Sequence, residues 1–174
     1  MTISFSHPNV LVLDDLLEKL AFLRGQGKRI VFTNGCFDII HPGHVDLLAR
    51  SRAVGDVLVL GVNSDESVRR QGKGSDRPFN TYEARAFVLA HLRSVDFVTR
   101  FDDDTPLALI KALRPDVLIK GGDWPVEKIV GADVVTADGG KVLSLPLLEG
   151  FSTSGLAERI RCGYECAGNK AQST

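Results

Sequence analysis

Two histidines three residues apart, His41 and His44, are the side chains of this sequence best suited to chemistry. They follow a β-branched run at 29–33, and Pro42 suits a first helical position, where its missing N–H does no harm. Residues three apart share one side of a helix, so both imidazoles can face one point. Histidine can carry charge near neutral pH, helix N-termini attract anions, and Gly43 lets a bulky anion approach the backbone. The segment therefore favours polyphosphate chemistry over an ordinary loop with two surface histidines.

The elements that must position this pair alternate between strands and helices. Residues 57–62 are apolar throughout, as in a strand that is buried on both faces of a parallel sheet. Other runs predict strands at 30–33, 95–98, 117–119, near 134–135 and at 142–145. Helices are predicted at 14–24, at 43–53, from 63–65, from Asn80 with Glu83 in a capping-box arrangement, between Thr105 and Arg114, and from Ser152 to about Arg161.

This alternation predicts a single α/β domain, a Rossmann-like three-layer α/β/α fold with a mostly parallel sheet. The core is expected over about 12–162, and the polar residues 163–174 are expected to form a loose tail. Ligands of such sheets bind outside the carboxyl ends of the strands. Polar clusters fall at these expected ends, at 33–38, 63–65, 120–123 and 152–154. Their shared position indicates a ligand site better than any one cluster does.

Composition argues against several classes of function. The formal net charge is −1 and the pI about 6.4, whereas nucleic-acid-binding domains are usually far more basic, so a small anion is the expected ligand. No apolar stretch approaches the ~20 residues of a membrane span, and the N-terminus lacks the layout of a signal peptide. The few cysteines, odd in number, suit a reducing cytoplasm. Neither Cys162 with Cys166 nor the histidine pair has the further ligands that a metal site requires.

Several polar residues allow either a structural or a functional interpretation. Lys73 and Arg77 are flanked by glycine and proline, which suits a solvated loop or a lid that closes on phosphate. Asn63 and Asp65 suit a helix cap or contacts with sugar hydroxyls. Cys36 is more typical of a small packed residue than of a nucleophile, because no general base is specified for it.

The two polar clusters nearest the C-terminus also allow either a structural or a functional interpretation. Ser152–Ser154 can cap a helix, and at the carboxyl rim their hydroxyls and the free N–H groups of that helix can hold phosphate. Lys120–Asp123 is by itself typical of a charged turn, and Trp124 suits a pocket wall or the core.

Taken in order, these motifs resemble a known enzyme family. His41-Pro42-Gly43-His44 is similar to the His-x-Gly-His signature of the nucleotidyltransferase superfamily related to class I aminoacyl-tRNA synthetases. Within it, the chain resembles the heptose 1-phosphate adenylyltransferases over about residues 12–162. The segments that carry this resemblance are Thr33-Asn34-Gly35-Cys36-Phe37-Asp38, Gly61-Val62-Asn63-Ser64-Asp65, Lys73-Gly74 with Arg77-Pro78, Lys120-Gly121-Gly122-Asp123 and Ser152-Thr153-Ser154. The ordered set is far more specific than the histidine signature alone.

The resemblance implies adenylyl transfer from ATP to a sugar 1-phosphate, D-glycero-D-manno-heptose 1-phosphate, which yields ADP-heptose for lipopolysaccharide or capsule precursors. Catalytic roles at the triphosphate are then implied for His41, His44 and Lys73. Substrate binding is implied for Asn63, Asp65 and Arg77. Nucleotide binding, in the first segment mainly through backbone groups, is implied for Thr33, Asn34, Gly35, Cys36, Phe37, Asp38, Gly43, Lys120, Gly121, Asp123, Ser152, Thr153 and Ser154.

The resemblance also implies Mg²⁺ held mainly by the nucleotide phosphates, a homodimer, and a separate heptose kinase upstream. The charge and hydropathy of the chain predict no nucleic-acid or membrane partner. Related cytidylyltransferases carry Arg-Thr-Glu-Gly where this chain has Leu147-Leu148-Glu149-Gly150, which argues against that cytidine-using branch. Many members also have a basic residue where Gly155 and Ala157 stand here.

Other functions remain in competition with this interpretation. One is a cytidylyl- or guanylyltransferase for another sugar or alcohol phosphate, and another is a nucleotide-binding regulator without turnover. A dinucleotide-dependent oxidoreductase is disfavoured, because Gly-x-Gly-x-x-Gly is missing after the first expected strand.

Overall fold

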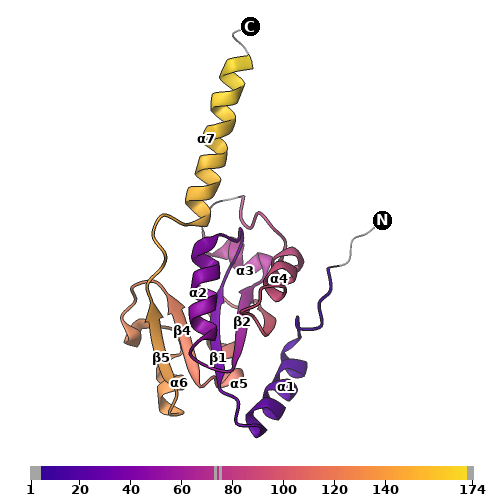
Figure 1. Ribbon diagram of the computed structural model, residues 1–174, viewed down its shortest axis with the longest axis vertical. Coiled ribbons are helices and arrows are strands. Elements are labelled where there is room, and N and C mark those ends of the chain that lie inside the picture. Colours follow the sequence, from indigo (N-terminus) through magenta and orange to yellow (C-terminus); the bar gives the residue numbers. More distant parts are fainter. Residues whose placement is uncertain (1–4, 73, 75, 172–174) are drawn as a thin grey trace.

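A five-stranded parallel sheet forms the centre of the molecule (Figure 1). The computed structural model describes residues 5–72, 74 and 76–171, and its account of side chains ends at residue 163. The strands are β1 (Ile30–Gly35), β2 (Val57–Asn63), β3 (Phe97–Phe101), β4 (Val117–Gly121) and β5 (Lys141–Leu145), in the spatial order β3-β2-β1-β4-β5. Every neighbouring pair of these strands runs parallel, as the apolar runs predict.

Helices cover both faces of the sheet, because alternate residues of each strand point to opposite sides. On one face, Ile30 and Phe32 pack in a core with buried side chains of α1 (Leu13–Gly25), α5 (Leu107–Leu113) and α6 (Ala132–Ala137). On the other face, Val31 packs in a core with buried side chains of α2 (Pro42–Arg52) and α4 (Tyr82–Ala90). The three-layer α/β/α prediction is therefore confirmed.

The carboxyl ends of β1 and β4 meet where the winding of the chain changes direction. From β1 the chain winds outward to β2 and β3, whereas β4 lies on the other side of β1 and is followed by β5. Connections that leave in opposite directions open a crevice at this point of a doubly wound sheet. The remaining elements are α3 (Asp65–Arg70), the short 3₁₀ helix η1 (Val126–Lys128) and α7 (Thr153–Ala171).

The short strand expected near 134–135 is wrong, because these residues lie in α6. Two β-branched valines favour a strand, but Gly131 precedes the helix with φ 85° and Gly139 follows it with φ 81°. Ala132 and Val135, one helical turn apart, are both buried in the core. The helical spacing of buried side chains therefore outweighs the local propensity.

Two predicted helix boundaries also need correction. The helix expected from Asn80 begins at Tyr82, and Thr81 is its N-cap, whose hydroxyl accepts a hydrogen bond from the Ala84 N–H. The last helix, expected to end near Arg161, continues to Ala171 and projects away from the body (Figure 1). The helix can extend beyond Arg161 because polar residues do not by themselves end a helix and no proline interrupts 153–171. In the described part of the chain, no helix is long and apolar enough to cross a membrane.

Candidate active site

The histidine pair lies at the start of α2, beside the carboxyl end of β1. His41 is the N-cap residue, Pro42 opens the helix, and the His44 N–H donates to the His41 carbonyl at 2.9 Å. The two rings stack with centroids 3.8 Å apart and planes 19° apart. The Phe37 ring meets the His44 ring edge-on, with centroids 5.2 Å apart. The two imidazoles therefore lie side by side at the start of α2, as their spacing of three residues predicts.

Gly43 allows the stack to form. A Cβ atom at this position would lie 3.1 Å from Nδ1 of His41 and 3.3 Å from Cβ of Phe151. The sequence suggested that this glycine admits an anion to the backbone. The structure adds a steric reason, because the space a side chain would occupy lies against the His41 ring and the residue two positions before α7.

Both imidazoles favour the neutral form. Burial lowers the pKa of His41, and it lowers the pKa of His44 to about 4, with repulsion from His41 as a second cause. The Ile39 backbone has a smaller effect on the pKa of His44, which it raises. Among the described residues, the buried Nδ1 atoms of both rings have no hydrogen-bond partner. Two uncharged rings with unused nitrogen atoms can donate to phosphate oxygens or take up protons.

The start of α7 converges on the same turn. The Ser152 hydroxyl caps the helix by accepting from the Gly155 N–H at 3.0 Å. The Thr153 hydroxyl lies 3.5 Å from the Ile39 carbonyl oxygen, two residues before His41. A helix N-terminus and two imidazoles thus lie beside one another, although more than a hundred residues separate them in the sequence.

Asp38 and Arg77 form a buried ion pair below this turn. Nη1 of Arg77 lies 2.7 Å from Oδ2 of Asp38, and both side chains are buried. Nη2 of Arg77 lies 3.3 Å from the Ser154 hydroxyl. In this structure Arg77 is therefore buried and paired rather than solvated, and it links the histidine turn to α7. Lys73, the other cation of the expected lid, lies outside the described residues.

Two residues expected at the ligand, Thr33 and Asn63, are buried, and a third, Asp65, is half-buried. The Thr33 side chain is 1% exposed, between β2 and β4. Asn63 is buried, with its amide donating to Ser67, and Asp65 pairs with Arg85 at 2.7 Å. Neither is the cap of α3, because the Ser64 hydroxyl accepts from the Ser67 N–H. The side chains of Asn63 and Asp65 are therefore engaged within the protein in this structure.

A cavity of about 190 Å³ opens between the ends of β1 and β4. It is lined by Asn34, Lys120 and Trp124, together with Pro106, Leu118, Ile119, Lys128, Ile129 and Val130. Gly121 lies at the same strand end, Asp123 is exposed nearby, and Gly35 lies under the Phe37 ring. The Cys36 thiol donates to the Gln71 side-chain oxygen at 3.3 Å, which agrees with a packed residue better than with a nucleophile.

Arg85 and Asn80 are site residues that the sequence did not reveal. The Arg85 side chain donates to the Cys36 and Asn63 carbonyls, and the Asn80 side chain donates to the Asp38 carbonyl. An arginine within an amphipathic helix is more typical of a solvent face, so its type and spacing gave no signal. Within the described residues, no group of three or more His, Cys, Asp or Glu could hold a metal ion.

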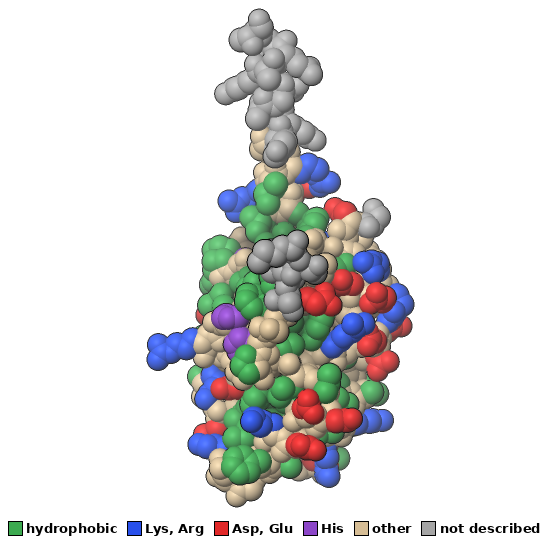
Figure 2. Space-filling view, turned by 90° about the vertical axis from the view of Figure 1, so that its right-hand side faces the viewer, with side chains coloured by type: hydrophobic (Ala, Val, Ile, Leu, Met, Phe, Trp, Pro, Cys, Tyr) green, Lys and Arg blue, Asp and Glu red, His purple; other side chains and the backbone are tan. Residues whose placement is uncertain are grey.

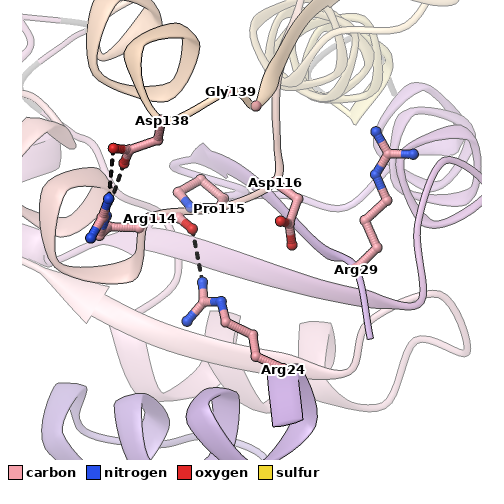
Figure 3. A pocket seen from close by; sticks show the side chains of 8 residues that line it. Arg24, Arg29, Arg114, Pro115, Asp116, Asp138 and Gly139 are labelled. Carbon is pink, nitrogen blue, oxygen red and sulfur yellow. Dashed lines mark hydrogen bonds and ion pairs between the residues drawn. The ribbon is translucent and has the colours of Figure 1, made fainter. Parts of the chain in front are cut away.

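A second cavity, of about 410 Å³, lies at the opposite rim, where the strands begin (Figure 3). It contains three arginines, but Arg24 donates to the Arg114 carbonyl at 2.8 Å and Arg114 pairs with Asp138 at 2.7 Å. The Arg24 guanidinium thus completes the C-terminal end of α5, where cations are favoured, and the Asp138 carboxylate balances the charge of Arg114. We therefore assign the candidate site to the carboxyl rim.

Comparisons with known proteins identify the family of this chain. The cytidylyltransferase-like family model matches residues 32–136, which include the histidine pair, most of β1 and all of β2 to β4. The bifunctional protein HldE of Azotobacter vinelandii is 51% identical over 156 residues, which cover 90% of this chain and 33% of that protein. HldE of Nitrobacter hamburgensis is 53% identical over 146 residues, or 84% of this chain and 30% of that protein. The chain thus spans about a third of the length of these curated relatives.

Solved structures share the fold. A lipopolysaccharide core biosynthesis protein from Thermoplasma volcanium superposes with a TM-score of 0.57 at 26% identity, covering 70% of this chain and 98% of that one. A pantoate-beta-alanine ligase from Francisella tularensis superposes with a TM-score of 0.55 at 14% identity, covering 79% of this chain and 67% of that one. The second likeness concerns the fold alone.

Proposed function

Because this chain belongs to the cytidylyltransferase-like family, we propose that it is a nucleotidyltransferase that transfers the adenylyl group of ATP to D-glycero-D-manno-heptose 1-phosphate. The products are ADP-heptose, a precursor for lipopolysaccharide or capsule, and pyrophosphate. Identity of about half to proteins named HldE and the likeness to a lipopolysaccharide core biosynthesis protein support this substrate class. The observation that carries the proposal is the convergence of the stacked histidines with the N-terminus of α7.

In the proposed reaction, a phosphate oxygen of the sugar phosphate attacks the α-phosphorus of ATP in line, and pyrophosphate leaves. No protein base is needed, because the attacking phosphate is already ionised. His41 and His44 donate hydrogen bonds to the triphosphate as charge builds on its oxygens, so that positioning and electrostatic stabilisation supply most of the rate. The Ser152–Ser154 segment holds phosphate through hydroxyls and free N–H groups. Lys73 is proposed, from the resemblance, to close over the phosphates.

The nucleotide is proposed to lie in the crevice between β1 and β4. The backbone of 34–38 wraps it, Lys120 and Trp124 border the cavity of about 190 Å³, and Asp123 lies at its edge. The internal bonds of Asn63, Asp65 and Arg77 suggest that these side chains shape the sugar site from behind in this conformation. Direct contact between them and the sugar would require those bonds to rearrange.

Mg²⁺ is proposed to arrive with the triphosphate, where it neutralises phosphate charge. The donor set agrees with this, because the Asp38 and Asp65 carboxylates near the turn are engaged by arginines and backbone N–H groups. The residues of this chain then bind and orient the nucleotide rather than build a cage for the metal.

Leu147-Leu148, in place of an arginine and a threonine, supports adenylyl rather than cytidylyl transfer. A panel that measures pyrophosphate release from ATP, CTP and GTP with several sugar and alcohol phosphates tests the proposal. We expect the largest kcat/KM for ATP with the heptose 1-phosphate. Preference for another nucleotide or acceptor would contradict the substrate assignment. ATP binding without pyrophosphate exchange, even with sugar phosphate present, would instead indicate a regulator.

We further propose that the chain acts as a cytoplasmic homodimer, and that a kinase activity outside residues 1–174 supplies the sugar 1-phosphate. Hydrophobic side chains gather on the surface below the base of the projecting helix (Figure 2). Those exposed near α7 include Phe79, Leu147, Leu148, Phe151 and Ile160. A surface of this kind suits association with a second copy. Sedimentation analysis of the chain measures its oligomeric state, and a monomer at micromolar concentration would contradict the dimer.

A further inference from the structure

A buried guanidinium group joins the carboxyl ends of two neighbouring strands. The Arg85 side chain, on the first turns of α4, is fully buried. Its Nη1 donates to the Cys36 carbonyl at 2.6 Å, just after β1, and its Nη2 donates to the Asn63 carbonyl at 2.8 Å, at the end of β2. Nε donates to the Asn80 carbonyl at 3.0 Å, and Asp65 balances the charge. The planar fork of arginine suits several fixed acceptors, which the single ammonium group of lysine does not.

A second set of bonds holds the chain two residues further on. The Asn80 amide donates to the Asp38 carbonyl at 2.7 Å. The Asp38 carboxylate accepts from the N–H groups of Phe79 and Asn80, each at 3.0 Å, and pairs with Arg77. Since the Asn80 carbonyl also accepts from Arg85, the two sets form one network around residues 36–38.

Phe37 lies between the two held carbonyls in a left-handed conformation, with φ 47°. A side chain with a Cβ rarely adopts this conformation, so the surroundings must impose it. The Phe37 ring is 4% exposed, and it borders the His44 ring at 5.2 Å. We expect that release of either neighbouring carbonyl would let the backbone relax and would move this ring away from His44.

We propose that Arg85 is a positioning residue, which fixes Phe37 and through it the His44 imidazole at the proposed adenylyl-transfer site. This inference rests on the proposed function for its kinetic consequence, but its structural part does not depend on turnover. Arg85 contacts neither reacting atom in this scheme, and it acts by holding the two strand ends at which the turn begins.

Arg85→Lys tests the inference, because it keeps the buried charge and removes the fork. We expect kcat to fall by about 10- to 100-fold, as for a reacting group displaced by about 1 Å, with a much smaller change in KM for ATP. We also expect the pKa of the His44 ring, followed by NMR titration, to rise from about 4 toward 6.5 as the Phe37 ring uncovers it. Arg114→Lys, at a two-point ion pair with Asp138 on the opposite rim, is the matched control and should change neither quantity.

A merely structural role for Arg85 would lower the melting temperature and leave the kcat of the folded enzyme and the His44 pKa at wild-type values. That outcome would overturn the inference. If Arg85→Lys does not fold, Asn80→Ala decides, because it frees the Asp38 carbonyl on the other side of Phe37 while the Arg85–Asp65 pair stays intact. It should shift both quantities in the same directions, and no shift would also overturn the inference. If the wild-type chain shows no adenylyl transfer, the proposed function is wrong. The NMR titrations of His44 would still test whether Arg85 positions Phe37 and His44.

Discussion

The two rims of the sheet use their polar side chains in opposite ways. At the amino-terminal rim, Arg24 and Arg114 border a cavity of about 410 Å³, but helix carbonyls and Asp138 engage their guanidinium groups. At the carboxyl rim, one cavity of about 190 Å³ lies between the strands and another of about 780 Å³ lies beside the start of α7. His41 and His44 are mainly neutral there, and their Nδ1 atoms have no partner among the described residues. Buried polar atoms without a partner are uncommon in folded proteins and call for a functional explanation. Two neighbouring imidazoles with unpartnered nitrogen atoms therefore distinguish the carboxyl rim from the amino-terminal rim better than the density of charge does.

The largest expected effect tests the carboxyl rim directly. His41→Ala or His44→Ala should each lower kcat for nucleotidyl transfer by at least about a hundredfold, because each removes a donor to the developing charge. Steady-state pyrophosphate release, with circular dichroism to verify folding, measures this effect. Near-normal turnover in both variants would remove the basis for placing the site here.

A smaller loss is expected from Gly43→Ala. The added methyl group would lie 3.1 Å from the His41 ring and 3.3 Å from Cβ of Phe151, so the stack or the entry to α7 must shift. We expect kcat to fall by about tenfold or more, as small misplacements of reacting groups do, with the fold retained. An unchanged kcat would show that catalysis does not require the stacked arrangement of His41 and His44.

A still smaller effect is expected on stability, because protonation of His44 at the carboxyl rim should make the free energy of unfolding depend on pH. The folded-state pKa of His44 is about 4, below the ordinary value of 6.5, so between these values the unfolded chain binds the proton and the folded chain does not. The free energy of unfolding should therefore fall as the pH drops from 6.5 toward 4. We expect about 1 kcal/mol from this group, less than the full shift implies, because solvent reaches part of the ring. Urea unfolding at pH 7.5 and 5 measures the loss, and His44→Gln should reduce it.

The smallest effect is expected at the amino-terminal rim. Asp138→Asn weakens an exposed ion pair with Arg114 and should leave kcat and KM unchanged, with little loss of stability. The transfer assay and a thermal melt test this. A large loss of activity would show that the two rims are coupled, and it would contradict the assignment of activity to the carboxyl rim alone.

The sequence predicted the layers of the fold because apolar runs report burial directly. Residues 57–62 fall within β2, and the polar clusters after the strands do lie at the carboxyl rim. Local pattern misled at 134–135, where β-branched side chains lie in a helix closed by glycines. It also gave no account of Arg85 and Asp38, whose partners Cys36 and Arg77 lie 49 and 39 residues away. Such networks depend on which strand ends become neighbours, and residue type and short-range spacing do not carry that information.

Gly121, at the end of β4, has no side chain, and the packing around the site depends on that. A methyl group there would lie 2.8 Å from Cδ2 of Leu47 on α2 and 2.9 Å from Cδ2 of Leu147, on the segment that leads to α7. The absence of a side chain thus allows α2 and the segment that leads to α7 to pack closely against the end of β4. In a saturation mutagenesis survey, intolerance at this position would report on that close packing, even though no side chain there ever touches a substrate.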